Sequence, residues 1–268
     1  MKNLLYILMS LFLLTGCEKE IDLDLEDKSG NIVIEGNISD QPGPYYVKIT
    51  KSVAFTQNNE YPLIEDAIVT LSDNSGQTET LQYIGAGRYE TTSFVTQPGK
   101  TYTMKVTAEG KEYSAKSTMP TPVSLDDLQQ DSFTIGGEIT YTLLPIFTDP
   151  SALGNRYLLK YSINNSSKKT FEIFSDNVNN GMVNQRPLVL PNDDEDPDDQ
   201  KVVIGDTIYV EMQCIDTNVF TYYSSLLQIS GGGPGGSVTP SNPPSNISNG
   251  ALGYFSAHTS SKRSVVIQ

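Results

Sequence analysis

The chain has 268 residues, of which 18 are basic and 32 are acidic, so its formal net charge is −14. A surface with this excess of negative charge repels nucleic acid and anionic lipid headgroups, which argues against both as partners. Fifteen tyrosines, 21 glycines and 15 prolines are typical of a chain made mainly of β-strands and turns. The length is sufficient for two modest hydrophobic cores or for one large core.

Residues 1–16 have the organisation of a bacterial lipoprotein signal peptide. Lys2 precedes the apolar stretch Leu4–Leu14, which is long enough for a signal-peptide core but much shorter than the about 20 residues of a transmembrane helix. Small residues follow, and then Cys17. We therefore expect a peptidase to cut before Cys17 and acyl chains on Cys17 to anchor the mature protein to outer-membrane lipid without spanning it. The alternative is an ordinary secretory signal that ends at a cysteine by chance.

Residues 17–30 are predicted to be a lipidated acidic tether. The run Glu18–Asp27 has too little apolar surface to form a core of its own. Acidic residues directly behind a lipidated cysteine also resemble the export signal that sends bacteroidete lipoproteins to the outer face of the outer membrane. We therefore expect the protein to face the cell exterior, and the alternative is a charged spacer without an address.

Residues 31–119 are predicted to form an Ig-like β-sandwich. The segments Tyr45–Thr50, Ala67–Ser72 and Tyr102–Thr107 alternate apolar and polar side chains with a period of two, which indicates half-buried strands. Turn-forming residues separate these segments at intervals of about ten residues. Because proline cannot donate to a strand ladder, the Met119–Pro122 segment predicts a domain boundary.

Residues 120–268 are predicted to form a second β-rich domain. Strands are expected at residues 138–147, 156–163, 170–174 and 207–215. In the last of these, Cys214 shares a face with three apolar side chains and is predicted to be a buried core thiol. If Cys17 is acylated, Cys214 is the one thiol left and no intramolecular disulfide can form.

The periodicity changes after the strand at 207–215. Apolar residues at three- and four-residue steps predict an amphipathic helix near 217–229, with Asp216 or Thr217 as its N-cap. A Gly/Pro-rich loop over residues 230–249 follows. A final pair of strands, at 251–257 and 263–267, completes the predicted fold class, which is mainly β with two sandwich-like domains, the second carrying one helix.

The sequence offers no catalytic motif. His258 is the one histidine, and no serine elbow, His-Glu-x-x-His pair or Cys-x-x-Cys pair accompanies it, so we interpret it as a strand-end or surface residue. The glycine run at 231–236 lacks the Gly-Lys-Ser/Thr of a phosphate-binding loop. The acidic run at 192–199 could bind calcium or could simply be solvated. We therefore predict no enzyme, no catalytic residue, no cofactor and no metal, and the sequence leaves any ligand-binding residue unidentified.

Several motifs in chain order carry a resemblance to a known family. They are Cys17–Asp22, Val33–Asp40, Gly43–Tyr45, Ala67–Asp73, Gly87–Tyr89, Pro98–Tyr102, Gly205–Glu211, Asn242–Ile247 and Gly250–Ala257. With these motifs the mature chain resembles the bacteroidete lipoprotein family catalogued as domain of unknown function 4249. Its first half, residues 31–119, is also similar to the prealbumin-like or carboxypeptidase-regulatory-like sandwich. The family has no established catalytic residues to transfer to this chain.

The resemblance implies a role at the outer membrane, because family members are typically encoded beside TonB-dependent transporters. We therefore expect an outer-membrane-anchored lipoprotein that acts as a non-catalytic binding or accessory partner of a TonB-dependent nutrient transporter. One alternative is a surface adhesin or envelope scaffold. Another is a hydrolase of a surface polymer, since two distant carboxylates would suffice for that chemistry.

Overall fold

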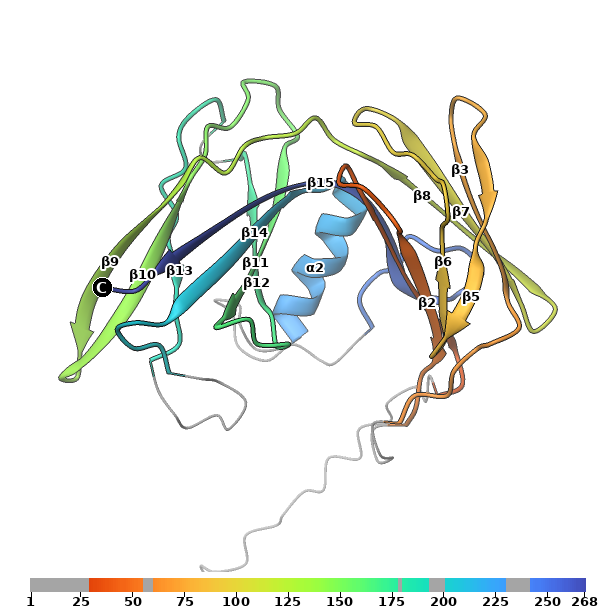
Figure 1. Cartoon of the computed structure of the whole chain (residues 1–268), viewed down its shortest axis with the longest axis horizontal. Helices are drawn as coiled ribbons and strands as arrows, with labels where there is room; N and C mark the ends of the chain where they lie inside the picture. The colour runs from red at the N-terminus through yellow and green to blue at the C-terminus, as the bar shows by residue number, and fades with distance from the viewer. Residues whose placement is uncertain (1–28, 55–59, 178–179, 193–200, 230–241) are drawn as a thin grey trace, which may run out of the picture.

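The computed structural model describes residues 29–54, 60–177, 180–192, 201–229 and 242–268. Three β-sheets and one helix make up this part of the chain (Figure 1), so the predicted mainly β fold class is confirmed. The predicted signal peptide, the lipidated Cys17 and nearly all of the acidic tether lie outside the described residues.

The first half of the chain forms a β-sandwich. Its strands are β1 (Ile32–Ser39), β2 (Tyr46–Lys51), β3 (Ile68–Asp73), β4 (Thr78–Thr80), β5 (Gln82–Gly85), β6 (Arg88–Glu90), β7 (Thr101–Ala108) and β8 (Lys111–Thr118). A four-stranded sheet in the order β4-β3-β7-β8 packs against β1, β2, β5 and β6. The predicted alternation is confirmed, because Val47, Leu71 and Met104 are fully buried in the core between these layers.

The second half forms another two-layer arrangement. Its strands are β9 (Asp127–Ile135), β10 (Glu138–Ile146), β11 (Arg156–Ile163), β12 (Thr170–Ser175), β13 (Leu188–Val189), β14 (Thr207–Cys214) and β15 (Leu252–Val266). A three-stranded sheet in the order β13-β10-β9 covers the strands β12, β11, β14 and β15. The sequence did not predict β9, because its central Gln129-Gln130-Asp131 segment lacks apolar alternation and only pairing with β10 defines it as a strand.

The two predicted C-terminal strands are one continuous strand of 15 residues, β15. Its first part pairs in parallel with β1, from Leu252 to His258. Its second part pairs antiparallel with β14, from Thr259 to Val266. The polar Ser260–Arg263 segment looks like a turn in the sequence, but its backbone is hydrogen-bonded to β14. As a result, one eight-stranded sheet in the order β12-β11-β14-β15-β1-β2-β6-β5 runs through both sandwiches.

The C-terminal segment therefore does not belong wholly to the predicted second domain. Ile247, Ala251, Phe255 and Ala257 are buried in the core of the first sandwich, although the sequence placed residues 120–268 in the second. The side chain of Asn246 holds the residues before β15 against the strand itself. It donates a hydrogen bond to the Phe255 carbonyl at 2.8 Å and accepts one from the Phe255 amide at 2.9 Å. The first core is thus completed by residues that are far from it in the sequence.

A glycine is required where β15 begins to pair with β1. Gly253 has a φ of +89°, and a Cβ built on it would lie 2.1 Å from the carbonyl oxygen of Ile34. Only a residue without a side chain accommodates both this backbone conformation and this close approach. The glycine in the closing motif of the family resemblance therefore has a structural function.

The helix α2 (Thr217–Ile229) has the predicted bounds. The Asp216 carboxylate accepts a hydrogen bond from the Val219 amide at 3.0 Å, which identifies Asp216 as the N-cap. Val219 and Tyr223 of the helix pack against Leu158 and Tyr254 of the large sheet. Within the described residues, no helix has the length and apolar character needed to cross a membrane. Of the predicted loop at 230–249, residues 230–241 lie outside the described part, and the rest contains neither a helix nor an extended strand.

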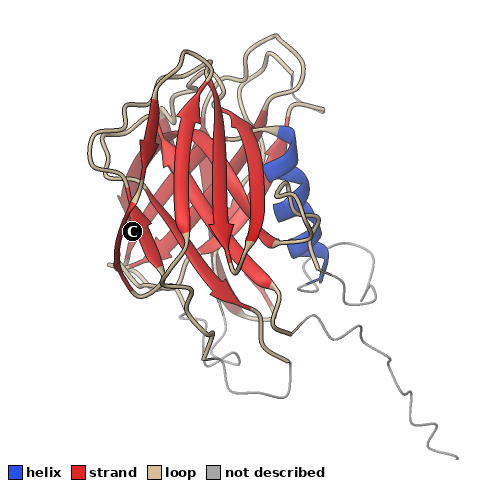
Figure 2. Ribbon diagram, turned by 90° about the vertical axis from the view of Figure 1, so that its right-hand side faces the viewer, coloured by secondary structure: helices blue, strands red, loops and turns tan. Residues whose placement is uncertain are grey.

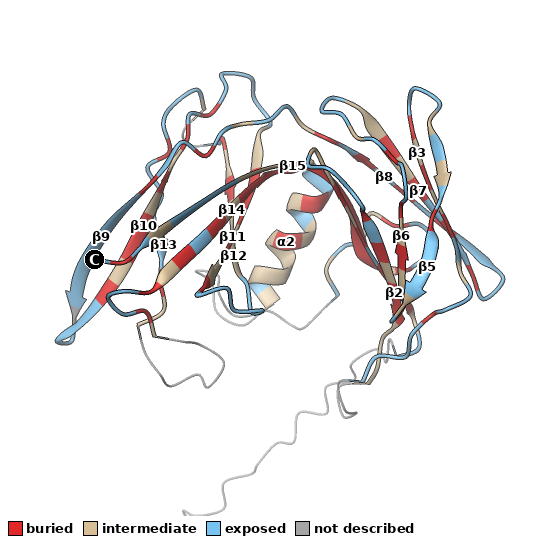
Figure 3. Cartoon of the chain, viewed as in Figure 1, coloured by how far each residue is buried: buried red, intermediate tan, exposed pale blue. Residues whose placement is uncertain are grey.

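The large sheet has two different faces. In Figure 1 the two sandwiches stand as the legs of an arch, β15 runs along its top, and α2 lies beneath it. Figure 2 shows α2 at one side of the strands. The outer face of the large sheet packs on the two smaller sheets, and buried and exposed positions alternate along the strands (Figure 3). We call the other face, which carries α2, the inner face; on β15 it is formed by the even-numbered residues from Tyr254 to Ser264.

Candidate functional site

Three charged side chains form a row on the inner face of the large sheet. Lys160 of β11 is paired in register with Glu211 of β14, and Glu211 is paired with Lys262 of β15. Directly paired residues of neighbouring strands project to the same face of a sheet. The strand order β11-β14-β15 therefore places one carboxylate between two ammonium groups, although the three residues are about 50 positions apart in sequence.

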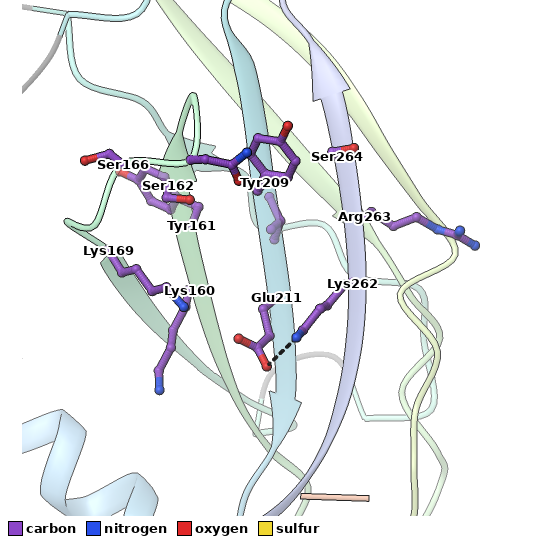
Figure 4. A pocket seen from close by; sticks show the side chains of 12 residues that line it. Lys160, Tyr161, Ser162, Ser166, Lys169, Tyr209, Glu211, Lys262, Arg263 and Ser264 are labelled. Carbon is purple, nitrogen blue, oxygen red and sulfur yellow. Dashed lines mark ion pairs between the residues drawn. The ribbon is translucent and has the colours of Figure 1, made fainter. Parts of the chain in front are cut away.

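This row lies in a pocket of about 610 Å³. Figure 4 shows the pocket with its lining residues, which come from three strands and the turn after β11. Besides the charged row, the lining residues are Tyr161, Ser162, Asn165, Ser166, Lys169, Tyr209, Val210, Arg263 and Ser264. The Arg263 side chain is directed away from the others (Figure 4), and its Nε donates to the Leu125 carbonyl at 3.1 Å. The open part of the pocket is thus walled by lysines, hydroxyl groups and one amide.

Glu211 is held in its ionised form. Burial opposes its ionisation, but the hydrogen bond from the Ser260 hydroxyl, at 2.7 Å, and the positive charge of Lys262 outweigh burial and hold the pKa of Glu211 below its usual value. The Lys262 ammonium lies 3.8 Å from the carboxylate. Since the Lys262 side chain is 67% exposed and the Glu211 side chain 19%, the lysine is free to move toward a ligand while the carboxylate is fixed.

Lys160 is the most enclosed cation of the pocket. Its ammonium lies 5.4 Å from the ring centroid of Tyr223 on α2, and in the described part of the chain it forms no ion pair. Burial lowers the pKa of Lys160, whereas the carboxylate of Glu211 opposes this effect. A partly desolvated ammonium of this kind gains more from an anionic partner than an exposed one, because the interaction is less screened by water.

A tight turn after β11 positions the remaining part of the wall. Asn164 and Asn165 both have positive φ angles, 49° and 60°, which asparagine tolerates better than most residues. The Asn164 side chain is fastened to the start of β14, donating to the Asp206 carboxylate at 2.7 Å and accepting from the Thr207 amide at 2.9 Å. Lys169 follows this anchored turn in the chain and lies at the rim of the pocket.

The charge of the pocket is opposite to that of the whole chain. Lys160, Lys169 and Lys262 against Glu211 leave a local charge of +2, whereas the chain carries −14. The arrangement is therefore suited to holding an anion by charge and by hydroxyl donors. Among the described residues, no group of three or more His, Cys, Asp or Glu side chains is placed to hold a metal ion.

The interpretation of His258 as a strand-end or surface residue is wrong. His258 lies in the interior of β15, where that strand passes from β1 to β14, and only 5% of it is exposed. Its Nδ1 is 3.1 Å from the Ser256 hydroxyl. Burial lowers its pKa from 6.5 to about 4, so the ring is neutral at pH 7. The error follows from splitting β15 into two strands, which places His258 beyond the end of the first.

Other residues singled out in the sequence do not contribute to the pocket. Cys214 is 4% exposed and faces the second core, which confirms the predicted buried thiol. Burial raises its pKa, so the thiol is protonated at neutral pH. Cys17 lies outside the described residues, as do the glycine run at 231–236 and residues 193–199 of the acidic run. Asn192, the first residue of that run, donates to the Thr140 hydroxyl at 2.6 Å.

A second charged cluster lies at the other end of β11, and its polar groups form hydrogen bonds with one another. The Tyr157 hydroxyl donates to the buried carboxylate of Asp149. The Asp176 carboxylate accepts hydrogen bonds from the Asn155 amide at 2.9 Å and from the Arg156 guanidinium at 2.8 Å. Because these groups already form hydrogen bonds with one another, the cluster stabilises the loop ends of the second core. We therefore do not expect these four side chains to bind a ligand.

The chain is similar to a known protein family over nearly all of its length. The family described as "Domain of unknown function (DUF4249)" matches residues 18–264. A search of curated proteins gives no match. Among solved structures, a two fibronectin type-III domain segment from chicken tenascin is 14% identical, with 69% of this chain and 91% of that chain covered and a TM-score of 0.24. A cytokine receptor complex is 8% identical, with 88% and 96% covered and a TM-score of 0.24.

Proposed function

Since the chain belongs to the family described as Domain of unknown function (DUF4249), we propose that it is an outer-membrane-anchored lipoprotein that binds a ligand without transforming it and serves a TonB-dependent nutrient transporter. The amino-terminal signal and Cys17 support the anchor. The charged pocket on the inner face supports the binding role. In this proposal the tether holds the folded part near the transporter, outside the cell.

The pocket is the observation that carries the binding role. Its principal side chains stand on three hydrogen-bonded strands, and these strands are backed by the buried second core. Sites built on strands are held more rigidly than sites on loops, so little ordering is required when a ligand binds. The pocket volume of about 610 Å³ lies in the range of binding sites for small molecules, where convergent polar groups fix the orientation of the ligand.

The transporter partnership is tested by affinity capture. The tagged, lipidated chain is purified from gently solubilised outer membranes and compared with a Cys17→Ala variant, which removes the acylated residue. Recovery of one TonB-dependent transporter in near-stoichiometric amount with the lipidated chain alone is the expected result. If a correctly lipidated and folded chain recovers no transporter, the accessory role is wrong.

A further inference from the structure

We propose that the pocket formed by Lys160, Lys169, Glu211 and Lys262 binds a small dianion, a molecule that carries either a phosphoryl group or two carboxylates. This inference depends on the binding role proposed above and adds the chemical class of the ligand. It does not depend on the transporter.

The local charge of the pocket suits a dianion. Apart from Arg263, whose side chain is turned away, the pocket has three ammonium groups and one carboxylate, which leaves +2, so a ligand with two negative charges neutralises it. The whole chain carries a net charge of −14 and repels anions at a distance. This pocket differs from the rest of the chain because its local charge is positive. A neutral or cationic ligand would leave the Lys160 and Lys169 ammonium groups without a counter-charge.

The spacing of the lysines also suits a ligand with two negative charges. Neighbouring strands lie about 4.8 Å apart, so the backbones of Lys160 and Lys262, which are separated by β14, lie about 10 Å apart. Lysine side chains are flexible enough to close on one group from both sides or to hold two groups of one molecule. Lys169 adds a third cation at the edge nearest to Lys160 (Figure 4). The hydroxyl groups of Ser162 and Ser264 are also lining groups and supply neutral donors to an anion.

The charged groups of the pocket differ in how far they are already paired before a ligand binds. Lys160 is partly desolvated and forms no ion pair in the described part of the chain, so an anion replaces lost water contacts there. Glu211 is already engaged by Ser260 and Lys262. Its carboxylate therefore acts as a fixed negative group that limits the net charge of the pocket to +2, which one dianion neutralises.

The experiment is isothermal titration of the purified full-length lipoprotein in detergent at pH 7.5 and 0.15 M salt. The probes are glycerol 3-phosphate and succinate as dianions, with acetate as the monoanion. We expect one of the dianions to bind with at least about tenfold higher affinity than acetate, since the second negative charge adds charge-assisted hydrogen bonds. If neither dianion binds, the proposal is wrong.

Variants of opposite charge sign sharpen the test. Lys160→Gln and Lys262→Gln each remove one cation and are expected to weaken binding of the dianion at least about fivefold. Glu211→Gln removes the fixed negative charge and is expected to strengthen binding by a similar factor. Lys116→Gln is the matched control, because Lys116 is exposed on β8 in the other sandwich and should leave affinity unchanged. A circular dichroism spectrum and melting curve establish that each variant is folded.

The signs of these effects decide the result. Weaker binding by both lysine variants together with stronger binding by Glu211→Gln supports the proposal. Equal effects of Lys116→Gln and Lys160→Gln would show non-specific attraction and overturn it. Dianion binding without transporter capture would leave the ligand class intact and contradict the accessory role, whereas capture without dianion binding would do the reverse.

Discussion

His258 is predicted to make the stability of this protein fall as the solution is acidified below pH 6.5. The ring is buried and its pKa in the folded chain is about 4, whereas the usual value is 6.5. The cause is mainly loss of water, to which the charges of Lys160 and Lys262 add, while Glu211 acts in the opposite direction. Acid therefore protonates the unfolded chain first and shifts the equilibrium toward it.

The size of the stability loss follows from the difference between the pKa of His258 in the folded chain and its usual value. Well above pH 6.5 the ring is neutral in both states and the full stability is present. Between pH 7 and pH 5 the difference in proton uptake amounts to about 2 kcal/mol, and the loss approaches about 3 kcal/mol near pH 4, where the folded chain also takes up the proton. The interval from pH 7 to pH 5 is the useful one, because most carboxylates titrate below it.

The assay is urea unfolding followed by tyrosine fluorescence and circular dichroism at pH 7, 6 and 5. The chain contains a single histidine, so the variant His258→Gln removes all imidazole titration. The test compares the slopes of stability against pH, so a lower starting stability of the variant does not affect it. We expect the native chain to lose about 2 kcal/mol over this interval and the variant less than about 0.5 kcal/mol. Parallel slopes for the two proteins would refute the reasoning.

Three further predictions concern packing and reactivity. Gly253→Ala is expected to cost at least about 3 kcal/mol in urea unfolding, because the new methyl group would meet a carbonyl of β1, whereas Gly205→Ala, which has a φ of +96° but open space, should cost about 1 kcal/mol. Asn246→Ala removes both hydrogen bonds to Phe255 of β15 and should lower the free energy of unfolding by about 2 kcal/mol. Asn242→Ala, at an exposed position, should leave it nearly unchanged, and equal losses in the two variants would contradict the role of Asn246. The Cys214 thiol should react with a thiol reagent at least about a hundredfold more slowly in native buffer than in urea, and rapid native labelling would disprove its burial.

Local patterns in the sequence predicted much of the fold. The alternation in β2, β3 and β7 and the helical periodicity of α2 depend on side chains a few positions apart, and burial of one face follows from them directly. The buried state of Cys214 was readable for the same reason, since its strand neighbours of equal parity are apolar. Strand β9 was missed because its polar segment carries no such pattern and is defined only by its partner.

The family membership was also readable, because short motifs of glycine, proline and asparagine recur in order along the chain. The structure supplies a physical reason for the last of these motifs. Asn246 pairs with the backbone of Phe255, and Gly253 passes close to β1. These are requirements of chain geometry, so the motif identifies the fold without identifying a ligand.

The sequence by itself determined the β-strand pattern, the helix and the excess of negative charge, because each depends on residue type or on neighbours along the chain. Only the tertiary structure decided that β15 is continuous, that His258 is buried, and that Lys160, Glu211 and Lys262 share one pocket. Strand pairing brings together residues that are far apart in the chain, and register fixes which side chains share a face. A single sequence carries no local signal for either, so the candidate site emerges only when β14 lies between β11 and β15.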